Sequence, residues 1–397
     1  MTAGLGHILR HAVGHPAFGA VIGRQSLAAR LDSCPHPSGF DYLRVILALG
    51  VVIVHASKVA GDQETLNFWR QDFALLNFSI LPMFFCLSGF LVAGSFERSR
   101  TLTGFLVRRG LRIYPALIVE VLLSALILGP ILTQLSLREY FSHADFYRYF
   151  SNTLGHIRYV LPGVFLQNPS PNVVNLSLWT VPYELACYLI FSFLAVIGAF
   201  RRSVILAASI GVLIYLALSP ASLSPYLGDW VGGLLKQHYR LPTFFLSGVA
   251  LYSIRKIIPF SLVLFCVCVA IHLYSTSYYM RNPQNSFASI ASLSYITVYL
   301  GVFDPPRMPL ILKGDYSYGI YLYAFPLQQL LATWPPARTS LAIAAGGIVL
   351  AALFAAFSWH CIEAPILARK ARVARWAEDL VGRLMAQRGV LEWGRGK

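Results

Sequence analysis

The chain is poor in charged residues. Only 12% of its 397 residues are Asp, Glu, Lys or Arg, and 56% are hydrophobic. A soluble globular protein carries roughly 25% charged residues, so this composition argues against a soluble protein. Apolar runs of about 17–25 residues, long enough for a helix to cross a bilayer, recur along the chain. The sequence therefore predicts an all-α integral membrane protein.

Acidic residues are the scarcer charged kind, with 17 Asp and Glu against 32 Lys and Arg and a net charge of +15. In a soluble protein this excess would suggest a nucleic-acid partner. In a membrane protein it agrees better with topology, because cytoplasmic loops collect Lys and Arg. We therefore expect the lipid bilayer, and no nucleic acid, as a partner.

The chain also lacks the cysteine pattern of a disulfide framework. It has six cysteines, most of them in or beside apolar runs, where they act as small buried hydrophobes. Cys266 and Cys268 are two residues apart in an expected helix and so point away from each other. We expect no disulfides and no metal site.

The apolar runs predict a polytopic bundle of about ten transmembrane helices. An even number of spans puts both termini on one side. That side then holds most of the 32 Lys and Arg residues and is taken as the cytoplasm. The expected domains are a cytoplasmic N-terminal segment (1–40), a transmembrane domain (41–365) and a basic amphipathic cytoplasmic tail (366–397). The expected spans are 43–58, 73–95, 114–134, 179–199, 203–218, 241–254, 257–275, 286–303, 316–334 and 341–362.

Two ionisable groups frame the first apolar run, LRVILALGVVIVH. Arg44 and His55 are eleven residues apart, which on a helix is about three full turns and about 16 Å, so they share one face. Ionisable groups inside a membrane are costly and usually functional. The alternative, equally supported by this stretch alone, is an Arg44 side chain that reaches the interface and a hydrogen-bonded structural His55.

A carboxylate follows in the stretch LWTVPYELACYLI. Glu184 lies early in a span that starts outside, so we expect it at a depth similar to that of His55. A carboxylate that faces an imidazole fixes its tautomer and raises its basicity. A structural Glu is the alternative, but two ionisable groups at one depth favour a shared polar cavity.

A third feature is the cationic stretch VRRGLRIYP. Arg108, Arg109 and Arg112 are spaced to lie on one helical face, and we expect Pro115 to open the next span with Tyr114 outside the helix. Arginines at a helix break suit phosphate oxygens. The simpler explanation is the cytoplasmic excess of positive charge.

Together these stretches resemble membrane-bound acyltransferase family 3, over roughly residues 38–366. The resemblance rests on the order and spacing of several motifs. They are Arg44 and His55 in an Arg-x10-His pattern, FFCLSGFLVAGS (84–95), RRGLRIYP (108–115), LWTVPYE (178–184), YSYGIYLYAFP (316–326) and IEAP (362–365). Many members carry a His in the late helix where this chain has Ala324, which leaves His55 as the main candidate.

The resemblance implies an O-acetyltransferase of the bacterial inner membrane with acetyl-CoA as donor. The implied acceptor is a hydroxyl of a cell-surface glycan or lipid-linked sugar. We expect His55 as general base, Glu184 to orient the imidazole or bind the acceptor, and Arg44 to position donor or substrate. The CoA phosphates are then expected on Arg108, Arg109 and Arg112. Two structural roles are expected as well: Ser88 and Gly89 permit close helix approach, and Glu363 pairs with an arginine.

Three alternatives stay open at this point. The same buried groups would serve a transporter or flippase of a glycan intermediate, although that reading predicts interrupted helices in matching repeats. A succinyltransferase of exopolysaccharide differs only in the acyl group. A non-enzymatic receptor is the least supported, because the longest outer segment, 135–178, is too short for a domain.

Overall fold

The protein was analysed as a computed structural model that describes residues 25–99, 101–198, 211, 240–278, 287–308 and 314–387. Within these ranges the chain folds into helices joined by loops, and an isolated bridge pairs Ser26 with Pro259. The predicted all-α class is therefore confirmed for the described residues.

Five helical stretches are long and apolar enough to cross a membrane. Each coincides with a predicted span. They are α4 (Gly39–Ala60), α6 (Ala74–Glu97), Leu102–Leu132, Leu176–Val196 and Ser340–Ala368. Many of their large apolar side chains are exposed, Leu189 and Leu341 among them, as expected for surfaces that face lipid.

Four further predicted spans are shorter helices in the structure. They are α14 (Arg240–Ser253), α15 (Leu262–Tyr278), α16 (Phe287–Val302) and α17 (Ser317–Ala332). The predicted span 203–218 lies almost wholly outside the described residues. Ten spans and the side of the termini therefore stay predictions.

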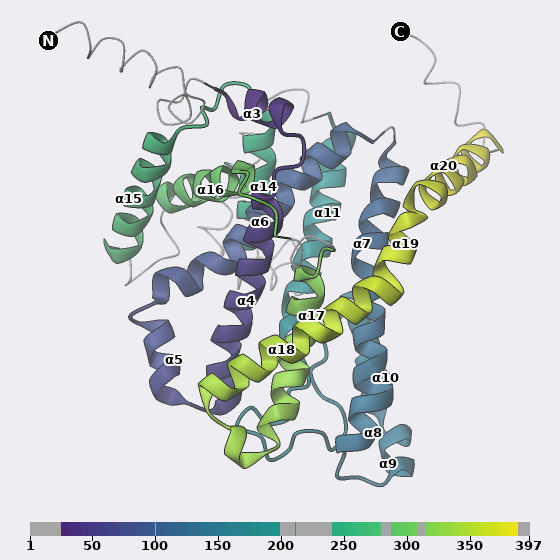
Figure 1. Cartoon of the computed structure of the whole chain (residues 1–397). Helices are drawn as coiled ribbons and strands as arrows, with labels where there is room; N and C mark the ends of the chain where they lie inside the picture. Colours follow the sequence, from purple (N-terminus) through teal and green to yellow (C-terminus); the bar gives the residue numbers. More distant parts are fainter. Residues whose placement is uncertain are drawn as a thin grey trace, which may run out of the picture. The chain divides into compact units, whose positions relative to one another are not determined.

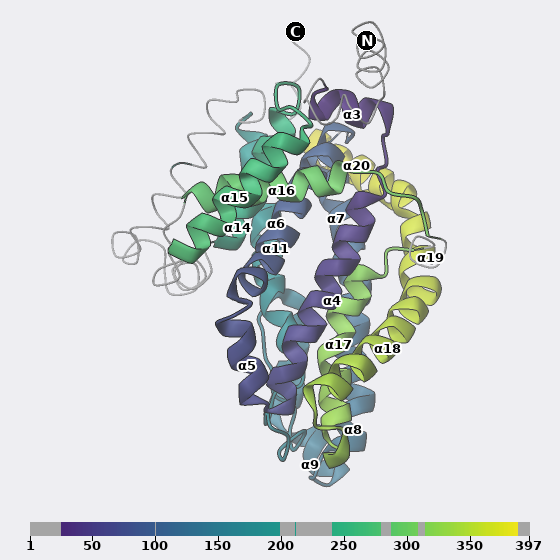
Figure 2. The same cartoon turned by 60° about the vertical axis from the view of Figure 1, so that its left-hand side comes forward.

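The chain divides into two compact units, described separately below. The first comprises residues 1–47, 72–94 and 193–310, and the second comprises residues 48–71, 95–192 and 311–397. In the first unit α16 packs against α14, α15 and the short α3 (Leu27–Ser33), and α14, α15 and α16 lie side by side in Figure 2.

Two glycines allow a close helix crossing in the first unit. A Cβ at Gly89 of α6 would overlap the carbonyl oxygen of Phe245 in α14, and a Cβ at Gly248 of α14 would overlap the carbonyl oxygen of Cys86. The backbones therefore touch with no side chain between them, as small residues allow in membrane bundles. The predicted role of Gly89 is confirmed.

Gly89→Ala is expected to lower the free energy of unfolding by about 1–3 kcal/mol, because the new methyl forces α6 and α14 apart. Gly110→Ala is the matched control, because a Cβ there meets Tyr114 at an ordinary 3.7 Å. Thermal unfolding in detergent measures both variants. Equal midpoints for Gly89→Ala and the wild type would contradict a tight crossing.

The second unit is organised around α7 (Leu102–Leu123), α17 and α18 (Ser340–Ser358). The α17 and α18 helices pack on each other, and α7 contacts α17 and α20 (Lys370–Gln387). Figure 1 shows α18, α19 (Ala364–Ala368) and α20 as one bent helical run at the C-terminal end of the chain. A π-helical turn, η8 (Trp359–Glu363), joins α18 to α19. Within the predicted amphipathic tail (366–397), the described residues from Lys370 form α20 as far as Gln387.

The expected helix break at Tyr114 is wrong. Helix α7 begins at the N-cap Thr101, whose hydroxyl accepts a hydrogen bond from Gly104 N at 3.0 Å, and continues through Pro115 to Leu123. A proline removes a single backbone donor and is tolerated inside helices that neighbours support. A second π-helical turn, η1 (Ser124–Leu128), and α8 (Gly129–Leu132) extend this stretch.

The segment between Leu132 and Leu176 contains the short helices α9 (Leu137–Ser142) and α10 (Ala144–Tyr149) and the 3-10 helix η2 (Phe150–Leu154). A further 3-10 helix, η3 (Leu176–Thr180), leads into α11 (Val181–Val196).

After α4, the helix α5 (Gln63–Arg70) is capped by Asp62, whose carboxylate accepts a 2.6 Å hydrogen bond from the Thr65 hydroxyl. This bond lowers the pKa of Asp62.

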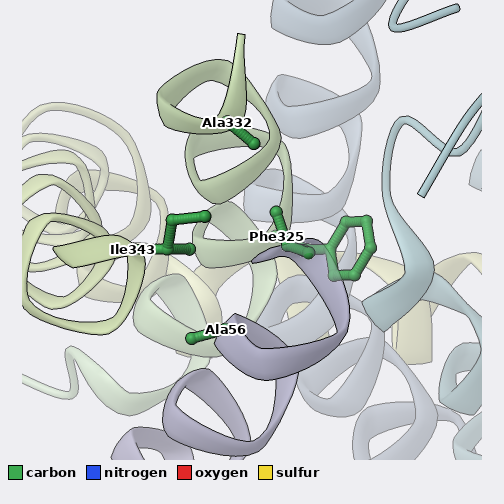
Figure 3. Packing of buried hydrophobic residues seen from close by; sticks show 5 residues of the cluster. Ala56, Phe325, Ala332 and Ile343 are labelled. Carbon is green, nitrogen blue, oxygen red and sulfur yellow. The ribbon is translucent and has the colours of Figure 1, made fainter. Parts of the chain in front are cut away.

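The core of the second unit includes an apolar cluster where α4, α17 and α18 meet. Figure 3 shows Ala56 of α4, Phe325 and Ala332 of α17 and Ile343 of α18, all of them fully buried. Val173 and Leu176 pack against this cluster. The cluster thus holds the second half of α4, which carries His55, against α17.

Candidate active site

His55 lies beside the apolar cluster with one ring nitrogen unused. Its ring meets the edge of Phe325, with the centroids 5.3 Å apart and the planes at 87°. Its Nδ1 is buried and has no hydrogen-bond partner within the described part of the chain. A buried polar atom is normally bonded, so an orphaned imidazole nitrogen marks a place where a ligand can bind.

Glu184 lies in the first turn of α11. Its Oε1 accepts a 2.7 Å hydrogen bond from the hydroxyl of Tyr188, one turn later on the same helix. Tyr318 and Tyr321 of α17 interact with its charge. Glu184 thus bonds Tyr188 of α11 and is near enough to Tyr318 and Tyr321 of α17 to act on them electrostatically.

Helix α17 relates Glu184 to His55. Tyr318, Tyr321 and Phe325 differ by three and four positions, so they lie on one helical face. Tyr321 belongs to the surroundings of Glu184 and Phe325 contacts His55, and these two positions are one turn, about 6 Å, apart along the axis. The structure thus brings both candidate groups to neighbouring turns of α17.

Arg44 lies on α4 as predicted, near its start. Its guanidinium is 3.9 Å from the carboxylate of Asp41, one turn earlier. Eleven helical residues separate Arg44 from His55, about 16 Å along the axis. Arg44 and His55 thus lie near opposite ends of one helix.

Arg112 is held by two carboxylates. It pairs with Asp315, next to the start of α17, and with Glu363 of η8 at 3.5 Å. Its guanidinium also lies over the ring of Tyr318, 5.8 Å from the centroid. The expected pairing of Glu363 with an arginine is confirmed, and Arg112 joins α7, α17 and η8.

Arg108 and Arg109 lie one turn earlier on α7. The guanidinium of Arg109 lies over Phe105, 5.8 Å from the ring centroid. At the start of the helix, the Thr101 hydroxyl donates to Glu378 of α20. The three predicted arginines are thus on one helix, and Arg112 pairs with the buried Glu363 and the partly exposed Asp315.

Sequence reasoning missed a second buried carboxylate, Glu120. It lies in α7, is only 1% exposed, and bonds Ser124 and Asn175. A Glu inside the apolar run ALIVEVLL is a detectable signal for a functional group in a membrane.

The comparison with known families gives a direct result. The family model described as "Acyltransferase domain" (Acyl_transf_3) matches residues 38–360. The chain belongs to this acyltransferase family. The match covers Arg44, His55, Glu184 and all three arginines of α7, and it confirms the family inferred from the motifs.

Two curated relatives support the assignment. An "O-acetyl transferase" of Shigella phage Sf6 is 28% identical over 306 residues, which cover 74% of this chain and 85% of the relative. "Nodulation protein 10" of Rhizobium leguminosarum bv. viciae is 28% identical over 385 residues, which cover 86% of this chain and 97% of the relative. No solved structure gives a significant match. The protein is thus an acyltransferase with the apolar helices of a membrane protein.

Proposed function

We propose that this acyltransferase moves an acetyl group from acetyl-CoA to a hydroxyl of a cell-surface glycan or lipid-linked oligosaccharide. The observation that carries the proposal is the buried, unbonded Nδ1 of His55 inside the region matched by the family. The name of the phage relative, an O-acetyl transferase, supports acetyl as the acyl group. We place the enzyme in the bacterial inner membrane as a multi-pass protein, with both termini in the cytoplasm.

In the proposed reaction His55 acts as general base. It takes the proton of the acceptor hydroxyl while the oxygen attacks the thioester carbonyl. The C–O bond forms, the C–S bond breaks, and the CoA thiolate leaves and takes up a proton. Glu184 orients the imidazole or binds the acceptor, and Arg44 positions the donor along the face it shares with His55.

Arg108, Arg109 and Arg112 are the proposed site for the phosphates of CoA. Guanidinium groups bind phosphate oxygens through paired N–H donors. Asp315 and Glu363 offset part of the charge of Arg112. These two contacts keep that part of α7 in place, so that Arg112 can act with the other two arginines in the proposed site.

The test is acyl transfer by the purified full chain in liposomes. Acetyl-CoA labelled on the acetyl group and a crude lipid-linked glycan extract are supplied, and labelled glycan and free CoA thiol are both measured. We expect them to appear in equal amounts. Transfer from succinyl-CoA at a higher rate would replace acetyl as the acyl group, and an absence of CoA release with any donor would overturn the proposal.

A further inference from the structure

The buried carboxyl of Glu120 uses only one of its two oxygens. Its Oε1 accepts hydrogen bonds from the Ser124 hydroxyl at 2.9 Å and the Asn175 amide at 2.8 Å. Its Oε2 is buried and has no hydrogen-bond partner among the residues that the structure describes. One oxygen of this carboxyl is therefore bonded by groups of the chain, and the other makes no hydrogen bond to the described residues.

Glu363 differs from Glu120 in having a charge partner. Glu363 is just as buried, at 2% exposure, and its Oε2 likewise makes no hydrogen bond to the part of the chain that the structure describes. However, Arg112 lies 3.5 Å from that oxygen, and Ser358 donates to Oε1 at 3.0 Å. The groups bonded to Glu120 are a hydroxyl and an amide. Burying a polar group in an apolar bundle lowers the free energy of unfolding unless its hydrogen bonds are made. With one oxygen unbonded and no charge partner within the described ranges, Glu120 is not explained by a contribution to stability.

A second unused group lies close by in the hydrogen-bond network. The hydroxyl of Ser177 in η3 is buried without a hydrogen-bond partner within the described ranges. Asn175 connects the two, because its Nδ2 donates to Glu120 and its Oδ1 accepts from Ser177 N at 3.0 Å. A carboxyl oxygen and a hydroxyl, both unbonded, thus flank one asparagine.

The position of this group ties it to the candidate active site. Asn175 Nδ2 also donates to the carbonyl oxygen of Leu322 at 2.9 Å, and Tyr321 donates to the carbonyl oxygen of Ser177 at 3.1 Å. Leu322 lies between Tyr321, which interacts with Glu184, and Phe325, which contacts His55. The π-helical turn η1 begins at Ser124, one turn after Glu120, and such turns are frequent at functional sites.

We propose that Glu120 and Ser177 form a subsite for a hydroxyl group of the acceptor sugar, a proposal that rests on the proposed function. A sugar hydroxyl donates one hydrogen bond and accepts others. It would donate to Glu120 Oε2 and accept from the Ser177 hydroxyl, which satisfies both orphaned atoms together. The subsite binds a hydroxyl that is not acylated and so orients the reacting one.

The test is the acceptor concentration that gives half the maximal rate, measured with a dilution series of the lipid-linked glycan extract. In Glu120→Gln the amide oxygen keeps the bonds from Ser124 and Asn175, so an amide NH₂, which cannot accept, replaces Oε2. We expect the half-saturating acceptor concentration to rise about tenfold in Glu120→Gln and about fivefold in Ser177→Ala. The half-saturating acetyl-CoA concentration should stay within about twofold of wild type.

Ser192→Ala is the matched control, because it removes a buried hydroxyl that bonds only its own helix, to Tyr188 O at 2.7 Å. The subsite is overturned if the half-saturating acceptor concentration is unchanged in both Glu120→Gln and Ser177→Ala. It is also overturned if the maximal rate falls while the half-saturating concentrations of both substrates stay unchanged. If the wild type transfers no acyl group, the proposed function is wrong, and so is the subsite that rests on it. If Glu120→Gln does not fold, Ser177→Ala alone decides the question.

Discussion

His55→Gln is expected to lower the rate of acyl transfer by about 10²–10⁴-fold, the usual contribution of a general base. Gln has a polar side chain but no basic nitrogen, so a structural hydrogen bond would survive while proton transfer would not. The measurement is the initial rate at saturating acetyl-CoA and glycan extract, together with CoA binding by the same sample. We expect CoA binding to be unchanged.

His272→Gln is the matched control for this prediction. His272 of α15 is buried in the first unit, and its two ring nitrogens lie 3.0 Å from the hydroxyls of Ser79 and Ser289. We expect its loss to reduce stability and to leave the rate per folded molecule within about threefold, since such a histidine fills a structural role. Equal rates for His55→Gln and the wild type would make His55 structural. Labelled protein formed from acetyl-CoA without acceptor would replace direct transfer by an acetyl-imidazole intermediate.

Arg112→Ala is expected to lower the free energy of unfolding by about 3 kcal/mol, at the low end of the cost of breaking a buried ion pair. The variant leaves Glu363, only 2% exposed, without its arginine, while Asp315 at 21% side-chain exposure is better hydrated. Equilibrium unfolding in mixed detergent micelles, followed by tryptophan fluorescence, measures the change.

Two further variants show whether the ion pair is the cause. Arg138→Ala removes an exposed arginine of the same unit and should change stability by less than about 0.5 kcal/mol. Adding Glu363→Gln to Arg112→Ala should recover part of the loss, because the uncompensated charge is then gone. Additive effects of Arg112→Ala and Glu363→Gln would contradict the pairing.

The apolar runs predicted most of the helices because every backbone group within a bilayer must be bonded inside its own segment. Helix α4 begins within four residues of the predicted span and ends within two. The break at Tyr114 was predicted wrongly, because the effect of Pro115 on local conformation is outweighed by the packing of α7 on α17 and α20.

For the candidate site, residue types were easier to predict than their partners. An Arg and a His at helical spacing are visible in a sequence, and so is a Glu in an apolar run. The neighbours of Glu184, Tyr318 and Tyr321, come from a helix more than 130 residues later. Such partners depend on which faces of two helices meet, and a single sequence does not contain that information. Asp315 and Asn175 were missed for the same reason.

The ion pair of Arg112 with Asp315 has a consequence for experiments that read only product formation. Asp315 precedes α17 by two residues, and the Glu184 contacts, the Asn175 bond and the His55 contact all lie on that one helix. If the start of α17 shifted along its axis, the contacts with Glu184, Asn175 and His55 would all be displaced together. Loss of the ion pair between Arg112 and Asp315 would therefore lower activity as loss of a catalytic group does. A mutant screen that measures activity alone would then wrongly identify Asp315 as a catalytic residue.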